Sequence, residues 1–210
     1  MRFKKIVCYC IATACYAFIN IGYTRPVTLN KINSSIGDSI ILMYGNSITH
    51  QGNWEELLDR KDVINWGYSG WTTQQLSWTI QGFLSKYKHV KICFIEGGIN
   101  DFTLGISTKR IFSNQKMVLD SIAHQHIIPV YQTTFYHLGE KKTNREIDKL
   151  NGLIKKFCDE RGYFFLDLRG VLSKNGDQIP EYTTDGVHLK PIAYNIWAKE
   201  IIKVLKKYDF

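Results

Sequence analysis

The chain has few of the residues that build disulfide frameworks or linkers. It contains five cysteines and four prolines in 210 residues, and no Pro/Gly/Ser-rich stretch, repeat or low-complexity tract. Three of the cysteines, at positions 8, 10 and 15, lie close to the N-terminus, so the body of the chain has only Cys93 and Cys158. We therefore expect two buried thiols instead of a disulfide framework. The length fits one domain with a full hydrophobic core.

Two further absences exclude classes of function. No set of cysteines and histidines has the spacing of a zinc site, so we predict no metal. The net charge of +8 is not arranged as a basic stripe interleaved with aromatic residues, which argues against nucleic acid as a partner. The basic residues near the C-terminus, at positions 203, 206 and 207, are typical of a solvated helix face.

The first 26 residues contain no acidic residue and have the pattern of a targeting segment. Arg2, Lys4 and Lys5 precede an apolar run over 6–23, which is typical of a secretory signal. The length of this run also fits an uncleaved membrane anchor. No clear cleavage site is present to decide between these two interpretations. We assign 1–26 to a signal peptide or N-terminal membrane anchor and 27–210 to the domain. The protein is then expected to be exported, whether periplasmic, secreted or at the cell surface, with the membrane contacted only through this segment.

Apolar strands alternate with amphipathic helices from residue 39 onward. Five short apolar runs predict strands over 39–44, 62–66, 90–95, 127–131 and 163–167. Between and after them, helices are predicted over 53–60, 73–86, 107–125, 144–161 and 191–207. Asn53–Glu56 has the pattern of a capping box, and Pro129 places doubt on a central position for the fourth strand. Strands that are apolar throughout predict a doubly wound α/β fold of about five parallel strands, with helices on both faces.

Four short segments carry the residues of a candidate active site. They are Gly45–Thr49 (GNSIT), Ser69–Gly70, Gly98–Asp101 (GIND) and Asp185–His188 (DGVH). The first three directly follow the first three predicted strands. Ligands bind beyond the carboxyl ends of the strands in such sheets, so these segments are expected to meet at one edge.

Ser47, His188 and Asp185 are the residue types that nucleophilic catalysis requires. A serine hydroxyl becomes a good nucleophile only when a base takes its proton, and histidine titrates in the range that suits this role. A turn at Gly186 could bring the Asp185 carboxylate to the imidazole of His188 and fix its tautomer. His50 is a rival base by its proximity to Ser47, but the sequence offers it no obvious carboxylate partner.

Acyl transfer also needs donors for the oxyanion that forms on the substrate. The backbone N–H groups of Ser47 and Gly70 and the side-chain amide of Asn100 could supply three. The alternative is that Gly70 and Asn100 only shape their turns and do not contact the oxyanion. Asp101 is interpreted as structural, holding the loop in which Asn100 lies.

In these four segments the chain resembles the SGNH hydrolase superfamily, also called the GDSL esterases and lipases. Further similarity lies in Asn65, in Thr72 and Thr73, and in the continuation of the last segment to Tyr194 and Trp197. The resemblance covers about residues 39 to 205 and is strongest to the branch of platelet-activating-factor acetylhydrolases and bacterial acetylesterases. It implies a three-layer flavodoxin-like fold, catalytic residues at Ser47, Gly70, Asn100, Asp185 and His188, and no metal or organic cofactor.

Two departures from the family pattern concern residues beside the nucleophile. Asn46 stands where the family usually has Asp, and Trp71 follows the glycine of the second segment, where Asp is frequent. We predict substrate contacts for Trp71, Tyr68 and Trp54, with ordinary packing as the alternative for each.

The expected activity is hydrolysis of small acyl esters, acetate above all, through an acyl-enzyme. Export and the aromatic residues favour O-acetyl groups on a glycan or glycolipid as substrate. Two alternatives remain open: an O-acyltransferase that uses a sugar acceptor, and a carbohydrate-binding protein without catalysis.

Overall fold

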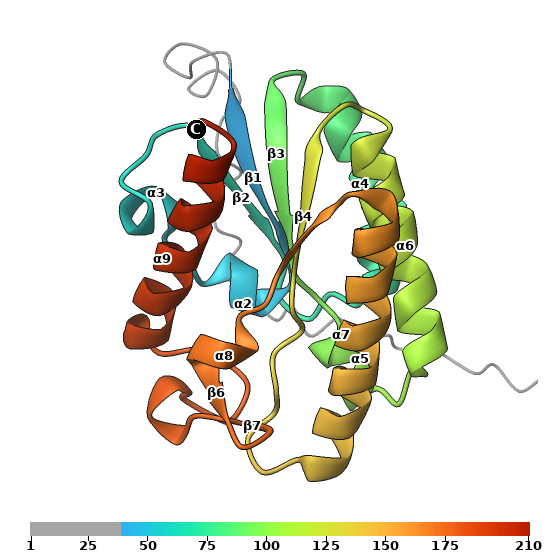
Figure 1. Cartoon of the computed structure of the whole chain (residues 1–210), viewed down its shortest axis with the longest axis vertical. Coiled ribbons are helices and arrows are strands. Elements are labelled where there is room, and N and C mark those ends of the chain that lie inside the picture. Colours follow the sequence, from blue (N-terminus) through green and yellow to red (C-terminus); the bar gives the residue numbers. More distant parts are fainter. Residues whose placement is uncertain (1–38) are drawn as a thin grey trace, which may run out of the picture. The chain divides into compact units, whose positions relative to one another are not determined.

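A computed structural model describes residues 39–210, so the targeting segment predicted over 1–26 lies outside the described residues. The centre of the fold is a parallel sheet in the order β2-β1-β3-β4-β5 (Figure 1). Its strands are β1 (Ile40–Gly45), β2 (Val63–Gly67), β3 (Val90–Ile95), β4 (Ile128–Gln132) and β5 (Phe164–Leu166). All five predicted strands are confirmed to within a residue or two, and the strand order is that of the flavodoxin-like class.

Helices cover both faces of this sheet (Figure 1). One face carries α4 (Thr73–Lys86), α6 (Thr108–Ala123) and α7 (Lys141–Arg161), and the other carries α3 (Trp54–Leu57) and α9 (Pro191–Lys207). Along β1, Ile41 and Met43 pack with α9, whereas Leu42 and Tyr44 pack with α4 and α6. Because both sides of the strand are buried, its sequence is apolar without alternation. The predicted three-layer architecture is therefore confirmed.

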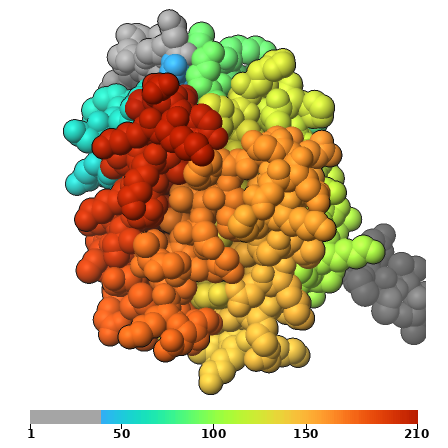
Figure 2. Space-filling view, in the orientation of Figure 1, coloured from blue at the N-terminus to red at the C-terminus, as the bar shows by residue number. Residues whose placement is uncertain are grey.

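Short elements complete the fold at the ends of the strands and before α9. They are α2 (Ser47–His50), α5 (Ile99–Thr103), α8 (Arg169–Leu172), β6 (Ser173–Lys174), β7 (Asp177–Gln178) and the 3-10 helix η1 (Pro180–Tyr182). The space-filling view shows α7, α9 and the chain between them together on one face (Figure 2). None of the helices within 39–210 combines the length and the apolar character needed to cross a membrane.

Pro129 lies in a central strand after all. β4 lies between β3 and β5, but Pro129 pairs with Cys93 on β3 one residue before the ladder to β5 begins at Val130. Proline has no N–H to donate to a neighbouring strand. It is tolerated here because only β3 pairs with the chain at this position. Cys93 and Cys158 are both buried and free, as expected.

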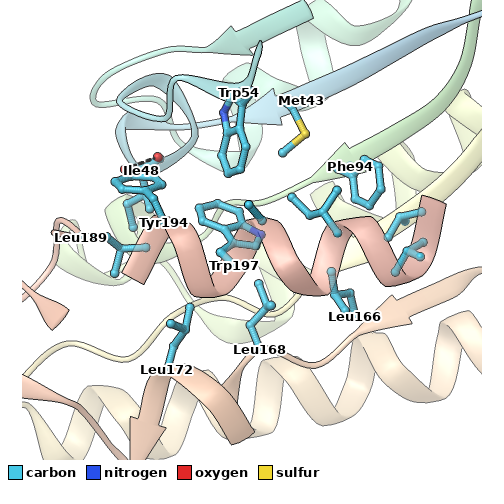
Figure 3. Close-up of a cluster of buried hydrophobic side chains, with 14 of the residues drawn as sticks. Met43, Ile48, Trp54, Phe94, Leu166, Leu168, Leu172, Leu189, Tyr194 and Trp197 are labelled. Atoms are coloured by element: carbon cyan, nitrogen blue, oxygen red, sulfur yellow. Dashed lines mark hydrogen bonds between the residues drawn. The ribbon is translucent and has the colours of Figure 1, made fainter. Parts of the chain in front are cut away.

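Two predictions around α3 were wrong. Asn53 makes no side-chain cap; its amide donates instead to the Glu56 carboxylate over 2.6 Å. Trp54 is only 1% exposed and packs edge-on against Trp197, with ring centroids 4.7 Å apart (Figure 3). Its indole N–H donates to the carbonyl of Thr49 over 2.8 Å. Trp54 therefore belongs to the core between α3 and α9 and cannot contact a substrate.

Candidate active site

The carboxyl ends of β1, β2 and β3 bring the first three sequence segments to one edge of the sheet. Ser47 is the first residue of α2, directly after β1, and Asn100 lies in α5, just beyond β3. Gly70 follows β2. β1 and β3 are neighbours in the sheet although β2 separates them in the chain, which makes this place the topological switch point. Ligands bind at such points in open α/β sheets.

The turn that carries Ser47 is tight for reasons visible in its neighbours. The Asn46 side chain caps α2, because its Oδ1 accepts a hydrogen bond from the N–H of Ile48 over 2.8 Å. Gly45 allows the turn to press against β3: a Cβ at this position would lie 2.2 Å from Thr49 Oγ1 and 2.7 Å from the carbonyl oxygen of Glu96. Only glycine permits this approach, so the local sequence determines where the Ser47 hydroxyl lies.

Ser47, His188 and Asp185 form one hydrogen-bonded series. Ser47 Oγ lies 2.9 Å from His188 Nε2, and His188 Nδ1 lies 2.7 Å from Asp185 Oδ2. The turn at Gly186, with φ of +94°, returns the chain as the sequence predicted. An ionised Asp185 accepts the Nδ1–H, which leaves Nε2 free to take a proton from the serine.

Asp185 is held in its ionised form. Burial raises its pKa, but hydrogen bonds from the His188 side chain and from the backbone N–H groups of His188 and Val187 outweigh burial and lower the pKa to about 2. The Asp185 carboxylate is thus charged throughout the neutral range of pH.

The loop that presents His188 is fixed by Thr183, which sequence reasoning missed. The Thr183 hydroxyl donates to the carbonyl of His188 over 2.8 Å and accepts from the N–H of Gly186 over 2.9 Å. No local pattern in the sequence distinguishes it from an ordinary loop threonine. The rival base, His50, has Nδ1 3.0 Å from the carbonyl of Gly67, so its partner is a backbone oxygen and not a carboxylate.

The three predicted oxyanion donors lie around the same edge. Within residues 39–210, the N–H groups of Ser47 and Gly70 donate to no other group, and Gly70 has the positive φ of +78° that glycine favours. The Asn100 side-chain amide donates to the carbonyl of Trp71 over 2.8 Å, which uses one of its two hydrogens. The loop of Asn100 is held by Asp101, which accepts from the N–H and hydroxyl of Thr73 over 2.9 and 2.6 Å. The structural interpretation of Asp101 is therefore confirmed.

Trp71 and Tyr68 form a stacked pair beside these donors. Their ring centroids are 4.1 Å apart with an angle of 14° between the planes. Tyr68 is 37% exposed, and Trp71 is half-buried against the core on the α4 side. The hydrogen bond from Asn100 to the Trp71 backbone places this pair next to the site, where a substrate could reach it.

Glu96 is the second residue that sequence reasoning missed. It follows β3 and is fully buried, yet it is a carboxylic acid. Asn46 Nδ2 donates to one carboxyl oxygen over 3.2 Å and Thr49 Oγ1 to the other over 3.3 Å. Burial raises the pKa of Glu96 to about 8 despite these hydrogen bonds. A carboxyl group at the end of an otherwise apolar strand was the only signal in the sequence. Among residues 39–210, no group of three or more histidine, cysteine or acidic side chains is placed to hold a metal.

The model of the GDSL-like lipase/acylhydrolase family matches residues 35–196. The chain belongs to this family. The expected relationship to the SGNH hydrolases is thereby confirmed. Family membership also favours the enzymatic alternatives over a purely carbohydrate-binding protein.

Known proteins similar to this family member fall into two groups. A curated relative, N-acylneuraminate cytidylyltransferase of Streptococcus agalactiae serotype III, is 30% identical over 172 residues, which cover 81% of this chain and 38% of the relative. The chain thus spans about two fifths of that relative's length.

Solved structures show the same fold at lower identity. A GDSL-like lipase from Bacteroides thetaiotaomicron superimposes with a TM-score of 0.72 and 20% identity over 90% of this chain and 94% of the other. A carbohydrate acetylesterase from Sinorhizobium meliloti superimposes with a TM-score of 0.63 and 15% identity, over 79% of this chain and 99% of the other. At this identity, the two likenesses support the fold alone.

Proposed function

We propose that the protein hydrolyses small acyl esters, above all acetate esters, through an acyl-enzyme on Ser47. The observation that carries this proposal is the hydrogen-bonded series from Ser47 Oγ to His188 to Asp185, over 2.9 and 2.7 Å. These distances lie within hydrogen-bonding reach, as nucleophile activation requires. Ser47 is 6% exposed and His188 is more open, so a substrate can reach the hydroxyl from the side of the imidazole.

The reaction proceeds in two steps, acylation of Ser47 and hydrolysis of the acyl-enzyme. Ser47 Oγ attacks the ester carbonyl carbon while His188 Nε2 takes the serine proton, and the imidazolium then gives this proton to the leaving alcohol as the carbon–oxygen bond breaks. Water attacks the acyl-enzyme in the second step and gives a proton to His188, which returns it to Ser47 as the acid leaves. Asp185 stays ionised throughout and stabilises the imidazolium.

Negative charge on the substrate oxygen is stabilised by the N–H groups of Ser47 and Gly70 and by the second amide hydrogen of Asn100. The first hydrogen of this amide is committed to the Trp71 carbonyl, and this contact holds the amide in place. Donors fixed before the reaction cost no reorganisation when the charge develops, and each is worth about 3–4 kcal/mol of the barrier.

The alcohol part of the ester is proposed to be a sugar. The stacked Trp71 and Tyr68 beside Asn100 offer an aromatic surface of the kind that packs against the apolar face of a sugar ring. The acetylesterase from Sinorhizobium meliloti acts on carbohydrates by its name, and the streptococcal relative is named for an acylneuraminate. Both names concern sugars and agree with an O-acetylated glycan or glycolipid as the substrate class, which is proposed on the aromatic surface.

Kinetics of Ser47→Ala test the nucleophile. With p-nitrophenyl acetate, turnover should fall to the background rate, and a fluorophosphonate probe should label the wild-type chain at Ser47 and not the variant. Asn151→Ala is a control for general damage because Asn151 is buried and its side chain hydrogen-bonds only to the backbone of Thr134. Full activity of Ser47→Ala would refute the proposal.

A panel of esters with acyl chains of increasing length, on p-nitrophenol and on sugars, tests the substrate. Preference for acetyl sugars supports the assignment, and preference for long chains would overturn it. Product analysis with and without an acceptor sugar separates hydrolysis from acyl transfer, because transfer yields a new sugar ester in place of free acetate.

A further inference from the structure

Glu96 is a fully buried carboxyl group that the mechanism above does not use. It lies directly after β3, and both carboxyl oxygens point to the turn that carries the nucleophile: one accepts from Asn46 and the other from Thr49. These residues flank Ser47 on both sides in the chain. Burying a carboxyl group costs free energy, and the two hydrogen bonds to the Ser47 turn offset part of that cost.

The contacts bind three parts of the site into one unit. Asn46 links α2 to the end of β3, because its Oδ1 accepts from the N–H of Ile48 while its Nδ2 donates to Glu96. The backbones are also in close contact here, since a Cβ on Gly45 would lie 2.7 Å from the Glu96 carbonyl oxygen. The end of β1, the start of α2 and the end of β3 lie together (Figure 1), and these contacts oppose a separate shift of any one of them.

We propose that Glu96 is a positioning residue that sets the Ser47 hydroxyl through Asn46 and Thr49, and that Asn46 is the amide partner this carboxyl group requires. The inference rests on the proposed role of Ser47 as nucleophile. It explains the departure at position 46 by chemistry. An amide there can accept from Ile48 and donate to Glu96 at once, whereas an ionised aspartate could do only the first.

Replacing Asn46 by aspartate separates these two functions. The substitution Asn46→Asp would keep the cap on Ile48 but place a second carboxyl group about 3.2 Å from Glu96. Two carboxyl groups at this distance must share a proton to remain together. The other charged or titratable groups whose fields reach Glu96 are Asp101, Tyr131 and Tyr194. All three are acids, so no cation is present among them to relieve the repulsion once that proton is lost.

The test is a double-mutant cycle of Asn46→Asp and Glu96→Gln, with kcat and KM measured near pH 6 and about pH 9. We expect Asn46→Asp to lose at least about tenfold in kcat at the higher pH, with a smaller loss at the lower pH and KM within about twofold, because the turn and not the substrate pocket is displaced. Glu96→Gln can still accept from Asn46 and should keep most of its kcat. In the double variant the amide and carboxyl group have exchanged places, so kcat should recover.

Asn151→Asp is the matched control, since it also buries a new carboxyl group but its side chain makes no hydrogen bond to Glu96 or to the Ser47 turn. Its folded fraction should keep wild-type kcat at both pH values. Glu96→Leu removes the acceptor outright and should lower kcat by about tenfold or more if it folds. If it does not fold, the cycle still decides the matter.

The proposal is overturned if Asn46→Asp follows the wild type at both pH values, or if the double variant is no better than Asn46→Asp. Failure of the proposed function has a different signature. In that case the wild-type chain itself would show neither esterase turnover nor labelling at Ser47 by a fluorophosphonate, whereas failure of the positioning role leaves both intact.

Discussion

Tyr194 on α9 donates a hydrogen bond from its phenol to the carbonyl of Ile48 over 2.6 Å, which ties the last helix to the helix that begins at Ser47 (Figure 3). Tyr194 is 6% exposed, so the bond is made away from water. We expect Tyr194→Phe to lower the free energy of unfolding by about 1–2 kcal/mol, because a buried carbonyl loses its partner. Chemical denaturation measures this value.

Tyr208→Phe provides the comparison for that prediction. Tyr208 is half-buried near the end of the chain, and its hydroxyl makes no hydrogen bond to another residue of 39–210. Its substitution should change the free energy of unfolding by less than about 0.5 kcal/mol. Equal losses for the two variants would show that the bond to Ile48 adds no stability.

Asn100 and Asp101 are neighbours with opposite roles, and substitution of each should affect a different quantity. Asn100→Ala removes one oxyanion donor and is expected to lower kcat by about 10²–10³-fold with little change in stability. Asp101→Ala removes the acceptor of two buried hydrogen bonds from Thr73, and should lower the free energy of unfolding by about 2–4 kcal/mol. Steady-state kinetics and thermal unfolding of both variants separate the two effects. A stability loss for Asn100→Ala as large as that for Asp101→Ala would contradict the assignment of Asn100.

The strands could be predicted from the sequence because the sheet is buried on both faces. Each strand is then an unbroken apolar run, and the change to helical spacing marks its end. The residues of the Ser–His–Asp series were also accessible, since the chemistry limits them to few types and three of the four segments follow strands. Trp54 shows the limit of this reasoning. An aromatic residue seven positions after the serine can face either the crevice or the core, and its partner Trp197 lies far away in the chain.

Glu96 and Thr183 could not be predicted for a related reason. Each acts through contacts whose partners come from a different part of the fold or from backbone atoms, and neither belongs to a local pattern that implies them. Glu96 depends on Asn46, fifty residues earlier, and on Thr49. The prediction of a capping box at Asn53 failed for the opposite reason. Its pattern was local, but the Asn53 side chain hydrogen-bonds to the Glu56 carboxylate and not to the backbone.

The stability of the protein should depend on pH through Glu96. Its pKa is about 8 in the native state, raised by burial, against an ordinary value of 4.5. Between these values the native state holds a proton that the unfolded chain has released. Stability contributed by this group is therefore lost as pH rises through the window, by up to about 1.4 kcal/mol per pH unit, and the loss ends above a pH of about 8.

Glu96→Gln isolates this contribution, because glutamine does not titrate. Denaturation curves of the wild type and the variant at several pH values between about 5 and 9 give a difference in which the histidines cancel. The wild type should lose stability relative to Glu96→Gln as pH rises. Parallel curves would mean that Glu96 has an ordinary pKa in the native state.

Trp71, which stacks on Tyr68, should give the enzyme its preference for sugar esters over p-nitrophenyl acetate. Trp71→Ala tests this role against one in packing alone. Loss of one aromatic face from a sugar site costs about 0.5–1.5 kcal/mol, so KM for an acetylated sugar should rise by roughly three- to tenfold, while kinetics with p-nitrophenyl acetate change much less. Trp78→Ala is the matched control, because Trp78 lies on α4, is 73% exposed and takes no part in the stack with Tyr68. If Trp71 only packs against the core, its substitution will lower stability and reduce activity toward both substrates alike. A rise in KM confined to the sugar ester, absent in Trp78→Ala, distinguishes binding from packing.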